Sequence, residues 1–455
     1  MPIEKLKSII NNQNFIALFL GAYFCSVLIP LIPILSYDYH NHQRIFQIIL
    51  NVSVFIFALC RFIKKPRLEL NITKNNSLLI LYFLTCGLLS MFFSDENLFS
   101  LMYIIHFMLL FHLLIVSTNI KTKQAVLCFI YILVAAHISL ILICFLNILF
   151  SLYDGSGLNR FNIYVGFINV RFFNQVQIFI LPLLLLLLKN KHINKLIIFS
   201  IALNLLLMFI GHARGALLSW TVVLCFIVLS NSSLKKQAIT SIYISVFSYL
   251  LFLYLNHLTN SEIEVIKTTT SGRYEIWLLT VSELNWGQLI LGNGPGIFEI
   301  SINNSSPFGH PHNSLIEILN EWGGLALVAI ILLISNTIKQ SYKHLKKYKK
   351  DKLTATVFYS WLGGITYSFV SGVHVMPVSQ TLIFVTWGIL LGRINKKVPL
   401  TISKNKSIKV ILCILSFILL TTYLYLCLKS YDIIDPEQGY IVGPRFWSVG
   451  KRFEL

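Results

Sequence analysis

Long uninterrupted runs of apolar residues are the feature that most constrains this chain. Segments such as "FILPLLLLLLK" and "VILCILSFILLTTYLYLCL" recur along its 455 residues. A helix of about 20 apolar residues spans the hydrocarbon thickness of a bilayer, whereas the helices of soluble domains are shorter and amphipathic. The sequence therefore predicts an all-α fold, a polytopic transmembrane helical bundle.

The apolar segments predict about 12–13 spans, of which the twelfth is short. They lie at 14–36, 45–63, 77–93, 98–118, 125–151, 173–188, 196–210, 216–230, 238–256, 314–336, 353–370, 381–392 and 408–428. The chain then divides into an N-terminal transmembrane bundle, a long loop that contains short helices, a C-terminal transmembrane bundle and an exported tail, with boundaries 1–256, 257–313, 314–428 and 429–455.

The charged residues predict the orientation of these spans. With the N-terminus inside, 27 of the 37 Lys and Arg residues fall on cytoplasmic segments, and 15 of the 18 Asp and Glu residues fall outside. A basic excess on cytoplasmic loops sets the topology of membrane proteins. The net charge of +19 is thus explained by connectors such as "KQSYKHLKKYKKDK" beside an anionic leaflet, and nucleic-acid binding is the weaker interpretation.

Arg214, in the short extracytoplasmic turn "GHARGA", is the first candidate for a functional residue. A cation close to the hydrocarbon boundary either reaches out to lipid headgroups or has a specific anion as its partner. The small neighbours Gly215 and Ala216 leave room for a bulky anion at the start of the next helix, which is a favourable site for phosphate. ATP is absent from this compartment, so group transfer there needs an exported, lipid-linked donor.

The long loop supplies a second candidate. Arg273 opens the segment 273–285, whose apolar spacing predicts an amphipathic helix on the membrane surface. A solvated surface charge is the alternative interpretation of this arginine. The following "GNGPGIF" predicts a tight re-entrant turn.

The stretch "GHPHNSLIEILNEWGG" (309–324) concentrates polar residues where the loop meets the tenth span. Asn313 is placed to cap the helix that begins there, and Glu317 and Glu321 follow on the same face, where they need basic partners. His312 has the side chain best suited to accept a proton from a hydroxyl near neutral pH. A histidine at a helix terminus can equally be a cap or an interface residue.

Together, "GHARGA", "SGRYEIW", "LGNGPGIF" and "HNSLIEILNEWGGLALV" resemble the O-antigen ligase and O-antigen polymerase superfamily of GT-C type glycosyltransferases. The resemblance covers roughly residues 170–340 by motif and the rest by hydropathy. It implies a metal-independent, inverting transfer of a glycan from undecaprenyl diphosphate to an acceptor hydroxyl at the periplasmic face of the bacterial inner membrane, without a cofactor.

The resemblance also implies roles for individual residues. Arg214 and Arg273 would bind the diphosphate, with Arg171 in "RFFNQVQ" as a third donor-binding arginine. His312 would activate the acceptor, and the nearby His310 leaves open which histidine is the base. The substrate-binding set further includes Glu317 and Glu321, no metal ligands are expected, and Ala213 stands where the family commonly has Ser.

Several functions are compatible with this chemistry. Ligation of O-antigen to lipid A core is the leading hypothesis, while an O-antigen polymerase or a pilin-type protein O-oligosaccharyltransferase would use the same donor. A lipid-linked oligosaccharide flippase would need polar groups near the bilayer midplane and repeated halves, which the sequence does not indicate.

Overall fold

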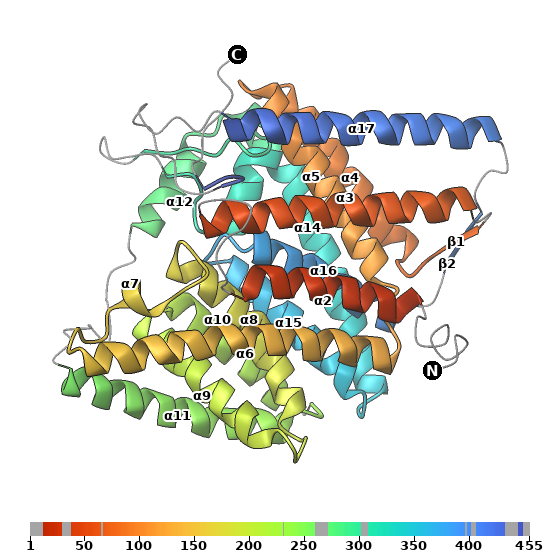
Figure 1. Cartoon of the computed structure of the whole chain (residues 1–455). Coiled ribbons are helices and arrows are strands. Elements are labelled where there is room, and N and C mark those ends of the chain that lie inside the picture. The colour runs from red at the N-terminus through yellow and green to blue at the C-terminus, as the bar shows by residue number, and fades with distance from the viewer. Residues whose placement is uncertain are drawn as a thin grey trace.

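The computed structural model of the chain is a bundle of long helices lying side by side (Figure 1). It describes residues 12–29, 38–64, 67–230, 232–259, 272–301, 308–395, 398–401, 406–432 and 445–448. The long helices are α2 (Asn12–Leu28), α3 (Tyr39–Lys64), α4 (Lys74–Met91), α5 (Asn97–Ser117), α6 (Lys123–Tyr153), α8 (Val170–Leu187), α9 (Asn194–Ile210), α10 (Arg214–Leu229), α11 (Lys235–Leu258), α14 (Ser314–Lys347), α15 (Lys352–Ser368), α16 (Pro377–Ile394) and α17 (Lys406–Asp432).

Every predicted apolar segment coincides with one of these helices. Within the described residues, eight helices are long and apolar enough to cross a membrane, and α2, α9 and α10 are shorter apolar helices. The chain is therefore a multi-pass helical membrane protein, as predicted. The first predicted segment, 14–36, extends beyond the last residue of α2, and its residues 30–36 lie outside the described part of the chain.

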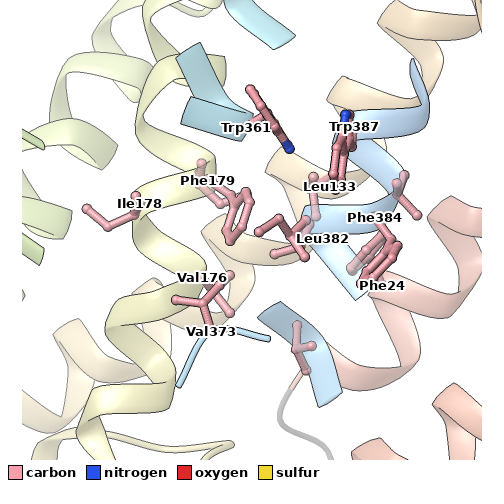
Figure 2. Packing of buried hydrophobic residues seen from close by; sticks show 14 of the residues in the cluster. Phe24, Leu133, Val176, Ile178, Phe179, Trp361, Val373, Leu382, Phe384 and Trp387 are labelled. Carbon is pink, nitrogen blue, oxygen red and sulfur yellow. The ribbon is translucent and has the colours of Figure 1, made fainter. Parts of the chain in front are cut away.

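Helices that follow the long loop in the sequence pack against helices that precede it. From the C-terminal set, α14 packs against α4, α15 against α8 and α16 against α5. Figure 2 shows part of this core, in which Trp361 of α15 and Trp387 of α16 lie 5.4 Å apart between ring centres. A Cβ at Gly364 would come within 2.2 Å of the Phe179 ring, so the glycine permits the close approach of α15 to α8.

The predicted cytoplasmic connectors meet at one end of the bundle. Strand β1 (Arg67–Leu70) pairs antiparallel with strand β2 (Val398–Thr401), a short ladder that the all-α prediction did not include. Beside it, Arg393 binds the Asp351 carboxylate at 2.9 Å and the Lys121 carbonyl at 2.8 Å. Four connectors that the charge pattern assigned to the same side therefore lie at the same end of the bundle.

Short helices occupy the opposite end. The long loop contains α12 (Arg273–Ser282) and α13 (Trp286–Leu291), as predicted, and the connection between α6 and α8 adds α7 (Arg160–Ile163). Helix α12 lies at the upper left of Figure 1, away from β1 and β2 at the right. The glycine-rich turn also forms: Gly292, Gly294 and Gly296 all have positive φ, a conformation that glycine adopts at little cost.

The twelfth predicted segment, 381–392, was too short. Helix α16 begins at Pro377, because a proline suits the first turn of a helix. Its first turn carries Ser379, Gln380 and Thr381, which are buried and hydrogen-bonded inside the bundle. Hydropathy alone scores such residues as a loop, so it missed the beginning of this central helix.

Candidate active site at one end of the bundle

The beginning of α8 brings a cation to the predicted catalytic histidine. The Asn169 side chain accepts a hydrogen bond from the backbone N–H of Arg171 and so caps the helix. The Arg171 guanidinium then lies 3.1 Å from Nε2 of His312. Because a guanidinium can only donate, Nε2 must accept, and the ring proton of the neutral imidazole is therefore on Nδ1.

The backbone around His312 is held in an unusual conformation. His312 has φ of 57°, a left-handed geometry that is uncommon for residues other than glycine and concentrates at functional sites. Its backbone N–H donates to Nδ1 of His310 at 3.2 Å, and the two rings meet edge to face at 4.1 Å. Trp277 of α12 donates to the Pro311 carbonyl at 2.8 Å. These contacts fix the position of the imidazole.

Arg273 and Arg214 complete a group of three arginines from separate segments. Arg273, at the beginning of α12, donates to the Val370 carbonyl at 3.0 Å. Its buried Nε has no hydrogen-bond partner among the described residues, so one N–H remains for a ligand. Arg214 is exposed at the beginning of α10. A Cβ at Gly215 would meet Tyr367 at 3.0 Å, so a small residue lets α10 approach α15 here.

The electrostatics of this group disfavour additional positive charge. The pKa of Arg273 is lowered by burial and then by the charges of Arg171 and Arg214. Burial and then His310, Arg171 and Arg273 hold the pKa of His312 far below its usual range. Burial, followed by neighbouring cations with Arg445 first, lowers the pKa of His310 to about 3. The site thus combines neutral imidazoles with cations that an anion would stabilise.

Helix α14 begins next to His312 with the predicted cap. The Asn313 side chain accepts from the backbone N–H groups of Leu315 at 3.0 Å and Ile316 at 3.3 Å. One residue later, the Ser314 hydroxyl lies 2.6 Å from Nδ1 of His374, which belongs to the connection between α15 and α16. The cap predicted from the sequence is confirmed, and it ties residues 309–313, the histidine loop, to α14.

The two glutamates of α14 also have the basic partner that the sequence required. Arg445, from the C-terminal segment 445–448, forms ion pairs with Glu317 at 3.3 Å and with Glu321. The Glu321 carboxylate additionally accepts from the backbone N–H groups of Gly296 at 2.9 Å and Phe298 at 3.1 Å. The sequence predicted that both glutamates bind substrate. These contacts favour a different role, in which the glutamates hold the glycine-rich turn and Arg445 in place.

The structure adds residues that sequence reasoning missed. His374 lies with Nε2 3.7 Å from Glu317 Oε2, so it stands between the Arg445 ion pairs and Ser314. Tyr367 is buried near Arg171 and Arg273. The signal in the sequence was faint: a lone histidine in a short, mostly apolar connection and one of two arginines in a tail of mixed composition. Within the described residues, no three His, Cys, Asp or Glu side chains are arranged to hold a metal ion.

The fold and this group of residues define the chain as a polytopic helical membrane protein with a cationic, histidine-containing site at one end of its bundle. No protein-family model matches the chain. No curated protein matches it either.

Proposed function

We propose that this protein is a metal-independent, inverting glycosyltransferase that moves a glycan from undecaprenyl diphosphate to an acceptor hydroxyl. One observation carries the proposal. Arg171 and Arg273, from separate segments, lie around His312 at the end opposite the basic connectors, and Arg214 is close enough for its charge to act on Arg273. That end would face the periplasm of a bacterial inner membrane, with the N-terminus in the cytoplasm.

The reaction needs a base and a place for the departing negative charge. His312 Nε2 would take the proton of the acceptor hydroxyl while that oxygen bonds to the anomeric carbon. The bond from the anomeric carbon to the diphosphate oxygen breaks, and its electron pair leaves with the lipid diphosphate. Guanidinium groups held in place beforehand stabilise such a leaving group without reorganisation. Attack from the opposite face inverts the anomeric centre.

The contact between Arg171 and His312 suggests how donor binding prepares the base. Before binding, the guanidinium occupies the Nε2 lone pair. A diphosphate that attracts Arg171 would release this nitrogen, and its negative charge would raise the pKa of His312 from its lowered value. The base would therefore become competent only when the donor is present.

Substitution of the charged residues tests the proposal. Arg171→Ala, Arg273→Ala and His312→Ala are each expected to abolish transfer from an undecaprenyl-diphosphate glycan in reconstituted membranes. His310→Asn is the matched control for the base, because its amide can still accept from the His312 N–H. Full activity of the His312 variant, with loss of activity only in the His310 variant, would exclude this assignment.

The acceptor distinguishes the possible products. We propose ligation to lipid A core, which predicts that a deletion strain loses all attached polymer while lipid-linked polymer accumulates. A single attached repeat would instead indicate an O-antigen polymerase, and a glycoprotein of reduced mass would indicate a protein O-oligosaccharyltransferase. A defect only in moving the lipid-linked glycan across the membrane would indicate a flippase.

A further inference from the structure

The end of the bundle opposite His312 contains a cavity of about 250 Å³ between α10, α14 and α15. Its buried wall includes Ala355, Phe358 and Tyr359 of α15. Its exposed rim includes Lys346 and Lys349 near the end of α14. From Ser314, beside His312, to this rim the chain follows about 50 Å of helix, so the cavity is separate from the proposed active site.

Hydroxyl groups and ammonium groups face this cavity from different elements. Ser230, Ser232 and Ser233 line it where α10 gives way to α11. The Ser230 hydroxyl lies 3.2 Å from the hydroxyl of the buried Tyr359. Lys346 belongs to the last turn of α14 and Lys349 follows the end of the helix, and both line the cavity. The combination of hydroxyl donors and cations suits a phosphate group.

The charges around the cavity are not neutralised by nearby carboxylates. In the described part of the chain, no ion pair joins Lys346 or Lys349 to an acidic residue. Asp351, which follows them in sequence, is bound by Arg393 and Thr354. The ammonium group of Lys352 lies against that of Lys189, which adds repulsion at this end of the bundle. An anion would relieve this excess of positive charge.

We propose that the cavity binds the phosphate of an anionic phospholipid. Phe226 and Phe358 give the cavity apolar walls, and the outer face of α10 continues from it with the exposed apolar side chains of Leu229, Val222 and Leu218. Acyl chains can lie along this face while the headgroup sits among the lysines and serines. Basic pockets between helices at a cytoplasmic surface bind anionic headgroups in this way.

Lipid binding to the purified full-length protein tests the proposal. Native mass spectrometry would titrate phosphatidylglycerol against phosphatidylethanolamine with the same acyl chains, and thermal unfolding would compare both lipids with inorganic phosphate. We expect phosphatidylglycerol to bind more tightly. The double variant K346Q/K349Q should weaken its binding about tenfold or more.

Two further variants make the outcome decisive. K343Q/K350Q removes the same charge from exposed positions of the same basic stretch and should leave the affinity for phosphatidylglycerol nearly unchanged. Ser233→Phe fills the cavity without a change of charge and should weaken binding. If K346Q/K349Q and K343Q/K350Q lost equal affinity for phosphatidylglycerol, the lipid would be attracted by the basic surface as a whole, and the proposal would be overturned. Stabilisation by inorganic phosphate equal to that by the lipid, or equal binding of the two lipids, would also overturn it.

Discussion

His312 and His310 illustrate which properties of a single residue the sequence can show and which it cannot. A histidine near a helix start is detectable in the sequence, and so is its suitability as a base. The sequence could not show that the left-handed backbone of His312 is tied to His310, or that Arg171 occupies its Nε2. The contact of Arg171 with His312 joins residues 141 positions apart, and no local pattern in the sequence records it.

The lowered pKa values predict how stability depends on pH. His310 and His374 have pKa values of about 3 in the folded protein, chiefly because of burial, against about 6.5 when unfolded. The unfolded state therefore binds more protons as the pH falls below 6.5, and the free energy of unfolding should fall. The slope approaches about 1.4 kcal/mol per pH unit for each such histidine.

Thermal unfolding in detergent across this pH range measures the effect. His310→Asn removes one titrating group while it retains a hydrogen-bond acceptor for the His312 N–H, so its stability should fall less steeply with decreasing pH. An identical slope in the variant and the native protein would show that His310 is protonated equally in both states.

At the scale of elements, the presence of each long helix was predictable from its apolar residues, whereas helix ends with polar residues were placed less well: α3 begins six residues before the predicted segment and α14 ends eleven residues after it. α14 was predicted from residue 314, and it begins at Ser314 with the Asn313 cap in place. The beginning of α16 was missed, because its polar first turn is satisfied by partners on other helices. Gln380, for example, accepts from Gln47 and Arg44 of α3. Burial of such residues depends on neighbours that the sequence does not reveal.

The contact between α13 and α14 predicts a second stability effect. Gly323 interrupts α14 with φ of 83°, and a Cβ there would lie 2.3 Å from the Ile290 carbonyl oxygen. Gly323→Ala should therefore lower the free energy of unfolding by about 2 kcal/mol or more, since strain and overlap add. Thermal unfolding would measure it. Gly287→Ala, on the exposed surface of α13, is the control and should cost much less, because its Cβ would meet only the Asn285 side-chain oxygen at 3.3 Å. Equal melting temperatures for the two variants would refute the strain argument.

At the scale of the whole molecule, the charge pattern separated the two ends of the bundle, and their connectors lie together as expected. The C-terminal segment 445–448 was not predictable. Phe446 is buried against Tyr103 and His106 and under the Arg44 guanidinium, 4.7 Å from its ring centre. Trp447 donates to Ser430 of α17 at 2.8 Å. The segment 445–448 thus packs against helices from both halves of the sequence.

Arg445 connects this tail to the proposed active site. It holds Glu317 and Glu321, and Glu317 lies beside His374, whose other ring nitrogen contacts Ser314 at the start of α14. Removal of one partner from a buried ion pair leaves an uncompensated charge and costs about 3–5 kcal/mol. Arg445→Met should therefore destabilise the protein by about this amount and reduce transfer even where the protein remains folded.

The stability cost can be separated from the effect on the site by removing the carboxylates as well. In R445M combined with E317Q and E321Q, no buried charge is left alone, so much of the stability should return. If Arg445 positions the histidine loop, transfer should stay low in this folded triple variant, with the loss mainly in kcat and little change in KM for the donor. Recovery of transfer together with stability would show instead that the tail contributes only to folding.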